Sequence, residues 1–402
     1  MNAPRRAARP RPSRRTRVVA RVGITALAVA FGASMTALSA VSMRMARTVV
    51  TPAGRARNVR ILSVDAAAQT VTLERSPDTV LPGRYGLFTT GTADYLRLGS
   101  VTTDDATTVT RKLLTHVPSE GRLAPEAAFS GWYYDEPEQL HLPVRSVVID
   151  SPIGACPAWE FPAEVDTDVW VIQVHGRGTT RAETLRAIPI FHDLGITSLA
   201  ISYRNDGEAP RSATGTYALG ASEWEDVDAA IAYATRGGAR RVLLMGWSMG
   251  GAMCLQTETQ SAHQDVISGL ILESPVVDWR SVLRYQGRMR RLPTPVVAVA
   301  EQILGSNWAS RVVAGGEAIP LDRLDRVAHA AELRHPVLIL HSDDDGFVPS
   351  DASHALAAAR PDLVTMETFE VARHTKLWNY DETRFTRVIQ DWVRRQGLAT
   401  DE

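Results

Sequence analysis

The sequence predicts an α/β fold in which a mostly parallel sheet is covered by helices on both faces. From about Pro143 onward, apolar runs of strand length alternate with helix-compatible segments over about 240 residues. Several of these runs are continuously apolar, which is typical of parallel strands buried on both faces. One of them, Val242–Met245, is followed by G-W-S-M-G-G, and this sequence places a serine at the carboxyl edge of the predicted sheet.

The N-terminal segment, residues 1–47, predicts a basic cytoplasmic tail followed by a transmembrane signal anchor. Its first 21 residues contain eight arginines and no acid, and Val22–Met43 then runs 22 residues without a charge. A span of about 20 apolar residues is long enough to cross a bilayer. The excess of arginines before the run puts the N-terminus in the cytoplasm, so the remainder is expected on the extracytoplasmic side of the cell membrane. Cleavage near Ala40 is the alternative.

The charge balance argues against nucleic acid as a partner. Without the eight N-terminal arginines, 36 basic side chains stand against 45 acidic ones, a net charge of about −9. A protein that binds the phosphate backbone is expected to carry a basic surface. We therefore expect a small-molecule or lipid substrate and a membrane contact through the N-terminal helix, and the sequence leaves the oligomeric state open.

Residues 48–138 predict a small β-rich module. Short alternating runs separated by turn residues are typical of antiparallel strands. The aromatic group Trp132, Tyr133 and Tyr134 is expected to pack against the following domain, with a binding strip as the alternative. The predicted strands are Val59–Val64, Thr70–Glu74, Arg84–Thr89, Tyr95–Val101 and Thr107–Leu113.

Residues 139–402 predict the α/β domain. A hairpin, Val144–Asp150 and Ala158–Pro162, precedes the alternating part. A short insertion, about residues 279–333, is predicted to be irregular and to form a lid. The other predicted strands are Val169–Val174, Ile196–Ser202, Val242–Met245, Leu270–Leu272, Val337–Leu340 and Leu363–Val371. The predicted helices are Arg181–Leu194, Ser222–Thr235, one from Gly251, Ser350–Ala359 and Trp378–Gln396.

Ser248 is the candidate nucleophile. A serine at a sharp turn between a strand and a helix needs small residues two positions before and after it, and Gly246 and Gly250 occupy these positions. The amide end of the following helix would face any negative charge that develops near the serine.

A serine nucleophile needs a base and an acid that orients the base. His354 and His374 are the histidines that follow the acidic loop, residues 341–349 (H-S-D-D-D-G-F-V-P). His354 lies in a predicted helix, whereas His374 lies in the loop after the last strand, from which an imidazole can reach Ser248. His374 is therefore the predicted base, and Asp343, Asp344 and Asp345 are the acids available in the loop.

These motifs resemble the α/β-hydrolase superfamily, in particular its serine aminopeptidase-like and lysophospholipase-like branch. The acid loop is similar to the family pattern H-G-x-x-D-x-x-V-P, with Ser342 in place of the glycine, and the resemblance implies that Asp345 is the acid. Some relatives use the position of Glu273 instead. The sequence H-G-R-G, residues 175–178, implies that the backbone N–H groups of Arg177 and Met249 form the oxyanion hole, and His175 is expected to be structural.

The resemblance implies a serine hydrolase that works through an acyl-enzyme, with Ser248, Asp345 and His374 as the catalytic residues, and the predicted anchor and lid favour a membrane-anchored enzyme that cleaves carboxylic esters. No cofactor or metal is required for this chemistry. A serine peptidase or aminopeptidase with the same triad, an acyltransferase and a non-catalytic binding protein of the hydrolase fold remain open as alternatives. The physiological substrate and the role of residues 48–138 are not determined by the sequence.

Overall fold

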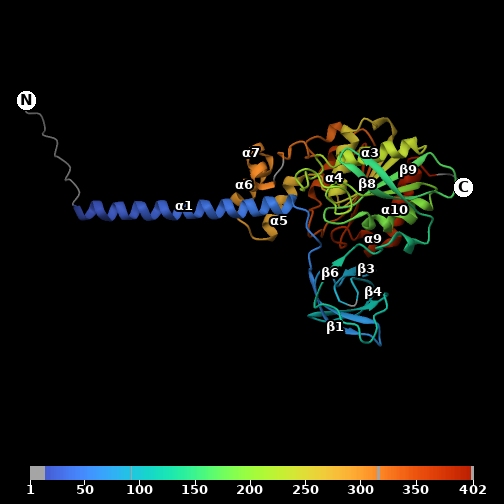
Figure 1. The fold of residues 1–402 in the computed structure, drawn as a ribbon, viewed down its shortest axis with the longest axis horizontal. Helices are drawn as coiled ribbons and strands as arrows, with labels where there is room; N and C mark the ends of the chain where they lie inside the picture. The colour runs from blue at the N-terminus through green and yellow to red at the C-terminus, as the bar shows by residue number, and fades with distance from the viewer. Residues whose placement is uncertain (1–13, 92, 315–316, 400–402) are drawn as a thin grey trace, which may run out of the picture.

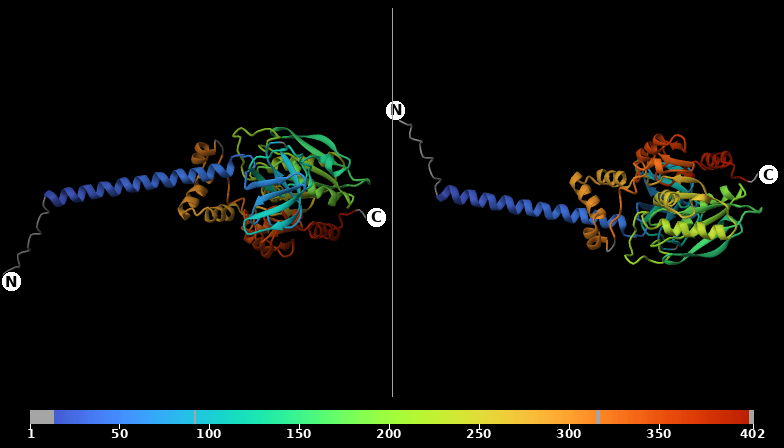
Figure 2. Two further views of the ribbon diagram at one scale, coloured as in Figure 1. Left: turned by 90° about the horizontal axis from the view of Figure 1, so that it is seen from below. Right: turned by 90° about the horizontal axis from the view of Figure 1, so that it is seen from above.

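A computed structural model describes residues 14–91, 93–314 and 317–399, with side chains from residue 32 onward except at 313 and 314 (Figure 1). A long N-terminal helix is followed by a closed barrel of six strands and by a larger domain built on an eight-stranded sheet. In all views the helix projects away from both (Figure 2).

The projecting helix is α1, Arg14–Val50, whose 37 residues correspond to a length of about 55 Å. The predicted membrane span Val22–Met43 lies within α1, and the side chains of residues 22–31 lie outside the described part of the structure. Within the described part, no helix has both the length and the apolar character that a membrane crossing requires. The transmembrane anchor is therefore not confirmed and stays a prediction.

The last turns of α1 belong to the larger domain. Met45, Ala46 and Val50 are buried in the main hydrophobic core together with residues of the sheet and of its covering helices. This end of α1 packs against α6 (Thr294–Gly305) and α7 (Asn307–Ala314), which come from the insertion (Figure 1). The helix is thus an integral part of the domain at one end and extends from it at the other.

The β-rich module is a closed barrel in which the strands follow the order β1-β2-β5-β4-β3-β6. The five predicted strands are present with small shifts at their ends, and a sixth, Glu126–Ser130, closes the barrel by pairing with both β1 and β3. The strands are β1 (Val59–Asp65), β2 (Thr70–Glu74), β3 (Tyr85–Phe88), β4 (Tyr95–Asp104), β5 (Thr108–Leu113) and β6 (Glu126–Ser130).

An arginine is buried in this barrel. The guanidinium of Arg111 donates to the backbone carbonyls of Thr79, Leu81, Gly83 and Gly99 at 2.7–3.1 Å. Burial lowers the pKa of Arg111 to about 10, so the side chain is still charged at neutral pH. These carbonyls satisfy a charge that would otherwise be costly to bury.

The larger domain contains the predicted mostly parallel sheet, in the order β14-β13-β12-β11-β9-β10-β8-β7. β7 and β8 form an antiparallel hairpin, β8 is antiparallel to β10, and the remaining neighbours are parallel. The strands are β7 (Arg145–Ser151), β8 (Gly154–Phe161), β9 (Val169–Val174), β10 (Thr197–Ile201), β11 (Arg241–Trp247), β12 (Ile267–Glu273), β13 (Val337–Ser342) and β14 (Val364–Phe369).

Helices cover both faces of this sheet. On β11, Val242 and Leu244 face one core, and Leu243, Met245 and Trp247 face the other. The first core also contains side chains of α3 (Trp224–Arg236), α4 (Met249–Gln260) and α8 (Asp351–Ala359), and the second contains those of α2 (Ile188–His192) and α10 (Glu382–Arg395). Burial on both faces explains why these strands are continuously apolar.

Two predicted helices are divided in the structure. The segment predicted as Arg181–Leu194 begins as a 3₁₀ helix, Arg181–Ala187, and continues as α2. The closing helix is interrupted at Asp381, which separates α9 (Leu377–Tyr380) from α10. The Asp381 carboxylate accepts the backbone N–H of Arg384 at 3.0 Å, so this residue caps α10.

The prediction of an irregular insertion was wrong, because most of residues 279–314 are helical. The helices are α5 (Trp279–Met289), α6 and α7. Asp278 caps α5 by accepting the backbone N–H groups of Arg280 and Ser281 at 2.8 and 2.9 Å. Pro293 lies just before α6, and Pro295 and Gly305 lie at its two ends, so the apolar pattern is divided into pieces too short to indicate a helix by periodicity alone.

Candidate active site

Ser248 lies at the turn between β11 and α4. Its backbone has φ 51° and ψ −113°, a strained conformation for a residue other than glycine. The side chain is 7% exposed. Strain of this kind persists only where the surroundings enforce it, and it is concentrated at functional sites.

The glycines around Ser248 allow three backbone segments to approach one another. A Cβ atom on Gly250 would lie 2.1 Å from the carbonyl oxygen of Val174, the last residue of β9. One on Gly246 would lie 2.6 Å from the backbone of Gly250. Both distances are far below van der Waals contact, so the turn requires glycine at the two positions that the sequence indicated.

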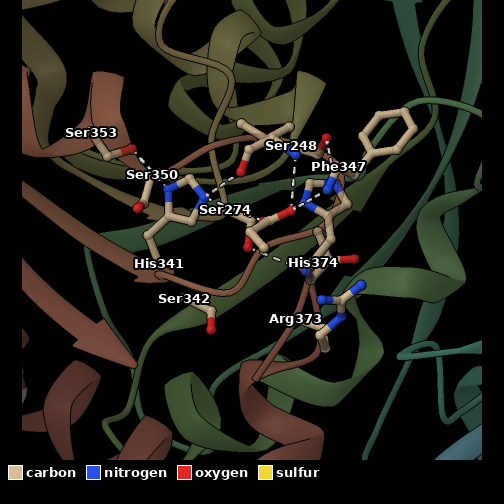
Figure 3. A network of polar contacts seen from close by, with 12 residues as sticks. Ser248, Ser274, His341, Ser342, Phe347, Ser350, Ser353, Arg373 and His374 are labelled. Atoms are coloured by element: carbon tan, nitrogen blue, oxygen red, sulfur yellow. Dashed lines mark hydrogen bonds and ion pairs between the residues drawn. The ribbon is translucent and has the colours of Figure 1, made fainter. Parts of the chain in front are cut away.

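His374 lies within hydrogen-bonding distance of both proposed partners. Its Nε2 is 3.0 Å from Ser248 Oγ, and its Nδ1 is 2.7 Å from Asp345 Oδ2. The flanking residues Arg373 and Thr375 have positive φ angles of 62° and 48°, so the loop after β14 turns sharply on each side of the imidazole. Figure 3 shows His374 directed toward Ser248, with the ring of Phe347 beside it.

Asp345 is buried and accepts four donors. Oδ1 accepts the backbone N–H groups of Phe347 and Val348 at 2.8 and 2.9 Å, and Oδ2 contacts the imidazoles of His374 and His341 at 2.7 and 3.3 Å. Burial by itself would raise the pKa of this carboxyl group, but the two histidines outweigh it, and the net pKa is lowered. An ionised Asp345 can only accept, so the His374 proton is on Nδ1 and Nε2 is free to accept from Ser248.

His341 is a residue of the site whose role the sequence did not suggest. It is fully buried, its Nε2 lies 3.1 Å from the carbonyl oxygen of Val348 as well as near Asp345, and Ser353 Oγ lies 2.8 Å from its Nδ1 (Figure 3). With two acceptors at Nε2, that nitrogen carries the proton. The histidine four residues before the acid, at the end of β13, was the available signal.

The other candidate acids have different partners. Asp344 accepts the backbone N–H groups of Ala372 and Arg373 at 3.1 and 2.9 Å, which ties the acid loop to the histidine loop. Asp343 pairs with His354 at 2.9 Å on the surface, so His354 is not part of the site. Among the residues that the structure describes, no group of acids, histidines and cysteines is arranged to hold a metal ion.

Glu273, the alternative acid, does not contact His374. It is fully buried at the end of β12, where it accepts Trp247 Nε1–H at 2.5 Å and the backbone N–H of Leu377 at 3.1 Å, with Arg186 at 3.5 Å. Burial raises its pKa, against the opposing charge of Arg186. These contacts indicate a structural role beneath the elbow.

The two predicted oxyanion donors lie on either side of the elbow. Met249 is the first residue of α4, and Arg177 follows Gly176, whose Cβ position would be 3.4 Å from Ser248 Cβ. In the described part of the chain, neither backbone N–H has an acceptor. Gly176 N–H donates to Glu183 at 2.8 Å, and Thr179 Oγ1 donates to the same oxygen at 2.8 Å. Glu183 therefore fixes this loop, and sequence reasoning missed it.

The side chains of this loop serve to hold it in place. His175 contacts Asp206 at 3.1 Å and stacks on Tyr203, the structural role that was expected. The Arg177 side chain points to α1 and the residue after it, where its guanidinium donates to the carbonyls of Thr48, Val49 and Thr51. Residues 175–178, called the oxyanion loop below because they contain one of the two predicted oxyanion donors, are thereby attached to the C-terminal end of α1. The last carbonyls of that helix lack partners within the helix.

Comparisons with known proteins support the fold of the larger domain. A family model described as "Alpha/beta hydrolase family" matches residues 169–388, and one described as a domain of unknown function matches residues 60–130. The uncharacterized protein YqkD of Bacillus subtilis is 24% identical over 241 residues, which are 59% of this chain and 74% of that protein.

Among solved structures, two are similar to this chain to different extents. An esterase of Pyrococcus furiosus has a TM-score of 0.51 at 16% identity, covering 65% of this chain and 94% of its own. A puromycin-hydrolyzing peptidase of Mycobacterium tuberculosis has a TM-score of 0.48 at 22% identity, covering 82% of this chain and 46% of its own. Because the family model spans more than half of its length, the chain belongs to the α/β-hydrolase family.

Proposed function

We propose that the protein is a serine hydrolase that cleaves carboxylic esters through an acyl-enzyme. The observation that carries the proposal is the relay of two short contacts, Ser248 Oγ to His374 Nε2 at 3.0 Å and His374 Nδ1 to Asp345 at 2.7 Å. Such a relay serves to activate a hydroxyl group as a nucleophile.

In the first step, Ser248 Oγ attacks the ester carbonyl carbon while its proton passes to His374 Nε2. The oxyanion that forms accepts the backbone N–H groups of Arg177 and Met249. His374 then gives the proton to the leaving alkoxide, the C–O bond breaks, and an alcohol departs. A water molecule, deprotonated by the same imidazole, attacks the acyl-enzyme, and the carboxylic acid and free Ser248 are released.

Two observations favour esters over peptides. The family likeness includes an esterase fold over nearly the whole length of that structure. In addition, α5 lies against the acid loop, where Tyr285 donates to the Asp345 carbonyl at 3.1 Å and Gln286 to the Phe347 carbonyl at 2.8 Å. A helical cover attached beside the catalytic acid suits the exclusion of water from an acyl group.

We also propose that α1 anchors the enzyme in the cell membrane with the catalytic domain on the extracytoplasmic side. The charge-free run Val22–Met43 after eight arginines supports this orientation. Reporter fusions at residue 60 and at the C-terminus test it, since both should be active only as extracytoplasmic reporters. Cytoplasmic activity of either fusion would refute the orientation.

Labelling of the full-length protein by a fluorophosphonate tests the nucleophile. The wild type should label and Ser248→Ala should not, with Ser261→Ala as a matched control that labels normally. Hydrolysis of nitrophenyl esters of increasing chain length should exceed that of aminoacyl anilides. A wild type that never labels would favour the non-catalytic binding protein, and faster turnover of the anilides would favour the peptidase.

A further inference from the structure

A cavity of about 600 Å³ lies where the barrel, the segment after α1 and the larger domain meet. Its walls are residues 51–55, Phe88 of the barrel strand β3, Trp132 just after β6, and the loops that follow β9 and β10. None of Ser248, Asp345 and His374 lines it, but Gly178, Thr179 and Thr180 do, and these directly follow the Arg177 oxyanion donor. The cavity is thus separate from the triad but adjacent to the loop that contains the proposed oxyanion donor Arg177.

The wall of this cavity contains an arginine without a counter-ion. The Arg55 guanidinium carbon lies 3.4 Å from the ring centroid of Phe88 and 4.2 Å from that of Trp132. No residue of the described chain forms a hydrogen bond or ion pair with this guanidinium, and its Nη1 is buried without an acceptor. Burial lowers the pKa of Arg55 to about 10, which leaves it charged at neutral pH.

The charged side chains that line the cavity are Arg55, Arg211 and Asp206, which together give its wall a net charge of +1. Arg211, exposed and also without a partner among the described residues, adds a second cation. Asp206 is the acid that lines the cavity, and its oxygens already accept His175 and the backbone N–H groups of Tyr203, Glu208 and Ala209. Glu183 acts on Arg55 electrostatically, but its Oε2 is held by the oxyanion loop.

A half-buried guanidinium stacked on aromatic rings is already oriented, so it loses little entropy when an anion binds. Its planar group of donors fits a carboxylate, and a wall with one net positive charge suits a monoanion better than a doubly charged phosphate. Pro52, Ala53, Phe88 and Tyr217 provide apolar wall for the remainder of such a molecule.

We propose that this cavity binds a small organic carboxylate, held by Arg55 with its apolar body against the barrel. The site goes beyond the ester hydrolysis proposed above and does not depend on it. It also assigns a role to the barrel, which supplies two walls of a ligand site next to the oxyanion loop.

Calorimetric titration of the full-length Ser248→Ala protein in detergent micelles tests the proposal, because this variant cannot hydrolyse an amide used as the uncharged control. The probe is 4-phenylbutanoate, and its uncharged analogue 4-phenylbutanamide is the control. We expect the carboxylate to bind and the amide to bind at least tenfold more weakly. Arg55→Met, which keeps an apolar side chain over the two rings, should weaken carboxylate binding by about 10- to 100-fold, as for the loss of a charged hydrogen bond.

The matched control is Arg288→Met, which removes an exposed arginine beside Tyr285 outside the cavity and should leave binding unchanged. Thermal unfolding of each variant verifies folding, and Arg55→Lys, which keeps the charge without the planar group, should give an intermediate affinity. The probe is titrated to about 10 mM, a concentration that detects dissociation constants of about 10 mM or tighter. The proposal is overturned if the protein with Arg55 intact does not bind the carboxylate in that range, or if the carboxylate and the amide bind alike. It is also overturned if Arg55→Met binds the carboxylate normally, or if inorganic phosphate binds more tightly than the carboxylate.

Discussion

Replacing Asp345 by asparagine should disable His374 while leaving the fold intact. The carbonyl oxygen of the new amide side chain can take the place of Oδ1 and accept the backbone N–H groups of Phe347 and Val348, which lie at 2.8 and 2.9 Å. The NH₂ group of that amide then occupies the position of Oδ2, where it meets Nδ1–H of His374 at 2.7 Å. Two donors cannot share that contact. His374 must move its proton to Nε2, which can then no longer accept the Ser248 proton.

The size of the effect follows from this change of tautomer. A triad in which the base is held in the wrong tautomer loses about 10⁴-fold in kcat, equivalent to about 5 kcal/mol of transition-state stabilisation. KM should change little, because Asp345 is buried and takes no part in binding the substrate. Glu273→Gln is the matched comparison, since Glu273 is equally buried but contacts Trp247 and Leu377 rather than His374. We expect it to lose less than tenfold in kcat.

Steady-state hydrolysis of a nitrophenyl ester, together with the rate of fluorophosphonate labelling, measures both variants. Circular dichroism and the midpoint of thermal unfolding establish that each is folded. The reasoning would be refuted if Asp345→Asn kept more than a tenth of the wild-type kcat, or if Glu273→Gln were the more damaging change. In the second case Glu273 would be the acid, and the loop must rearrange when substrate binds.

Four further predictions follow from particular contacts. Gly250→Ala should abolish activity and lower the unfolding temperature, because its Cβ would lie 2.1 Å from the Val174 carbonyl oxygen, whereas Gly305→Ala, with its nearest atom at 3.9 Å, should be neutral. Arg177→Met should lower kcat in ester hydrolysis by about tenfold at constant KM. Complete loss of one oxyanion donor lowers kcat by about 10²–10³-fold, and a donor that is only displaced should have a smaller effect. An unchanged kcat would show that the backbone alone holds this loop. Arg111→Met should reduce the free energy of unfolding in urea by about 3 kcal/mol, because four carbonyls lose their donor, whereas Arg75→Met, at an exposed ion pair, should leave the unfolding free energy nearly unchanged. Because the pKa of Asp345 is lowered on folding, its ionised form contributes stability above about pH 4. The difference in unfolding free energy between wild type and Asp345→Asn should therefore shrink as the pH falls below that value. A difference that stays constant with pH would contradict the lowered pKa.

The parts of the fold that could be predicted are those where burial imposes a simple pattern. β9, Val169–Val174, is buried on both faces, so its continuous apolar run identified it without error at either end. The three helices of the insertion were missed because each is short and they divide their apolar residues between α1 and the core. The sixth barrel strand, Glu126–Ser130, was missed because its E-A-A-F-S sequence has no alternation of polar and apolar residues.

In the candidate site, too, some residues could be predicted from the sequence and others could not. Ser248, Asp345 and His374 each follow a strand of one parallel sheet, so topology alone brings them to one edge, and the two contacts that join them through His374 are 3.0 Å and 2.7 Å long. Glu183 and His341 act through contacts inside the loops themselves: Glu183 accepts from Gly176, seven residues before it, and His341 contacts Asp345, four residues after it. No spacing in the sequence indicates the Glu183 contact, because it depends on how the loop folds back on itself, whereas the position of His341 four residues before Asp345 was a signal that the sequence did contain.

The attachment of α1 divides that helix into two parts with different tolerance to cleavage. Met45, Ala46 and Val50 fill the catalytic domain's core, and the carbonyls of Thr48 and Val49 hold Arg177, whereas residues 32–37 are exposed. A protease that cuts near Ala40 would release a catalytic domain that keeps its complete core and its oxyanion loop. A cut a few residues further on would remove Met45, Ala46 and Val50 from that core, so the position of such a cut would decide whether the released domain keeps its fold.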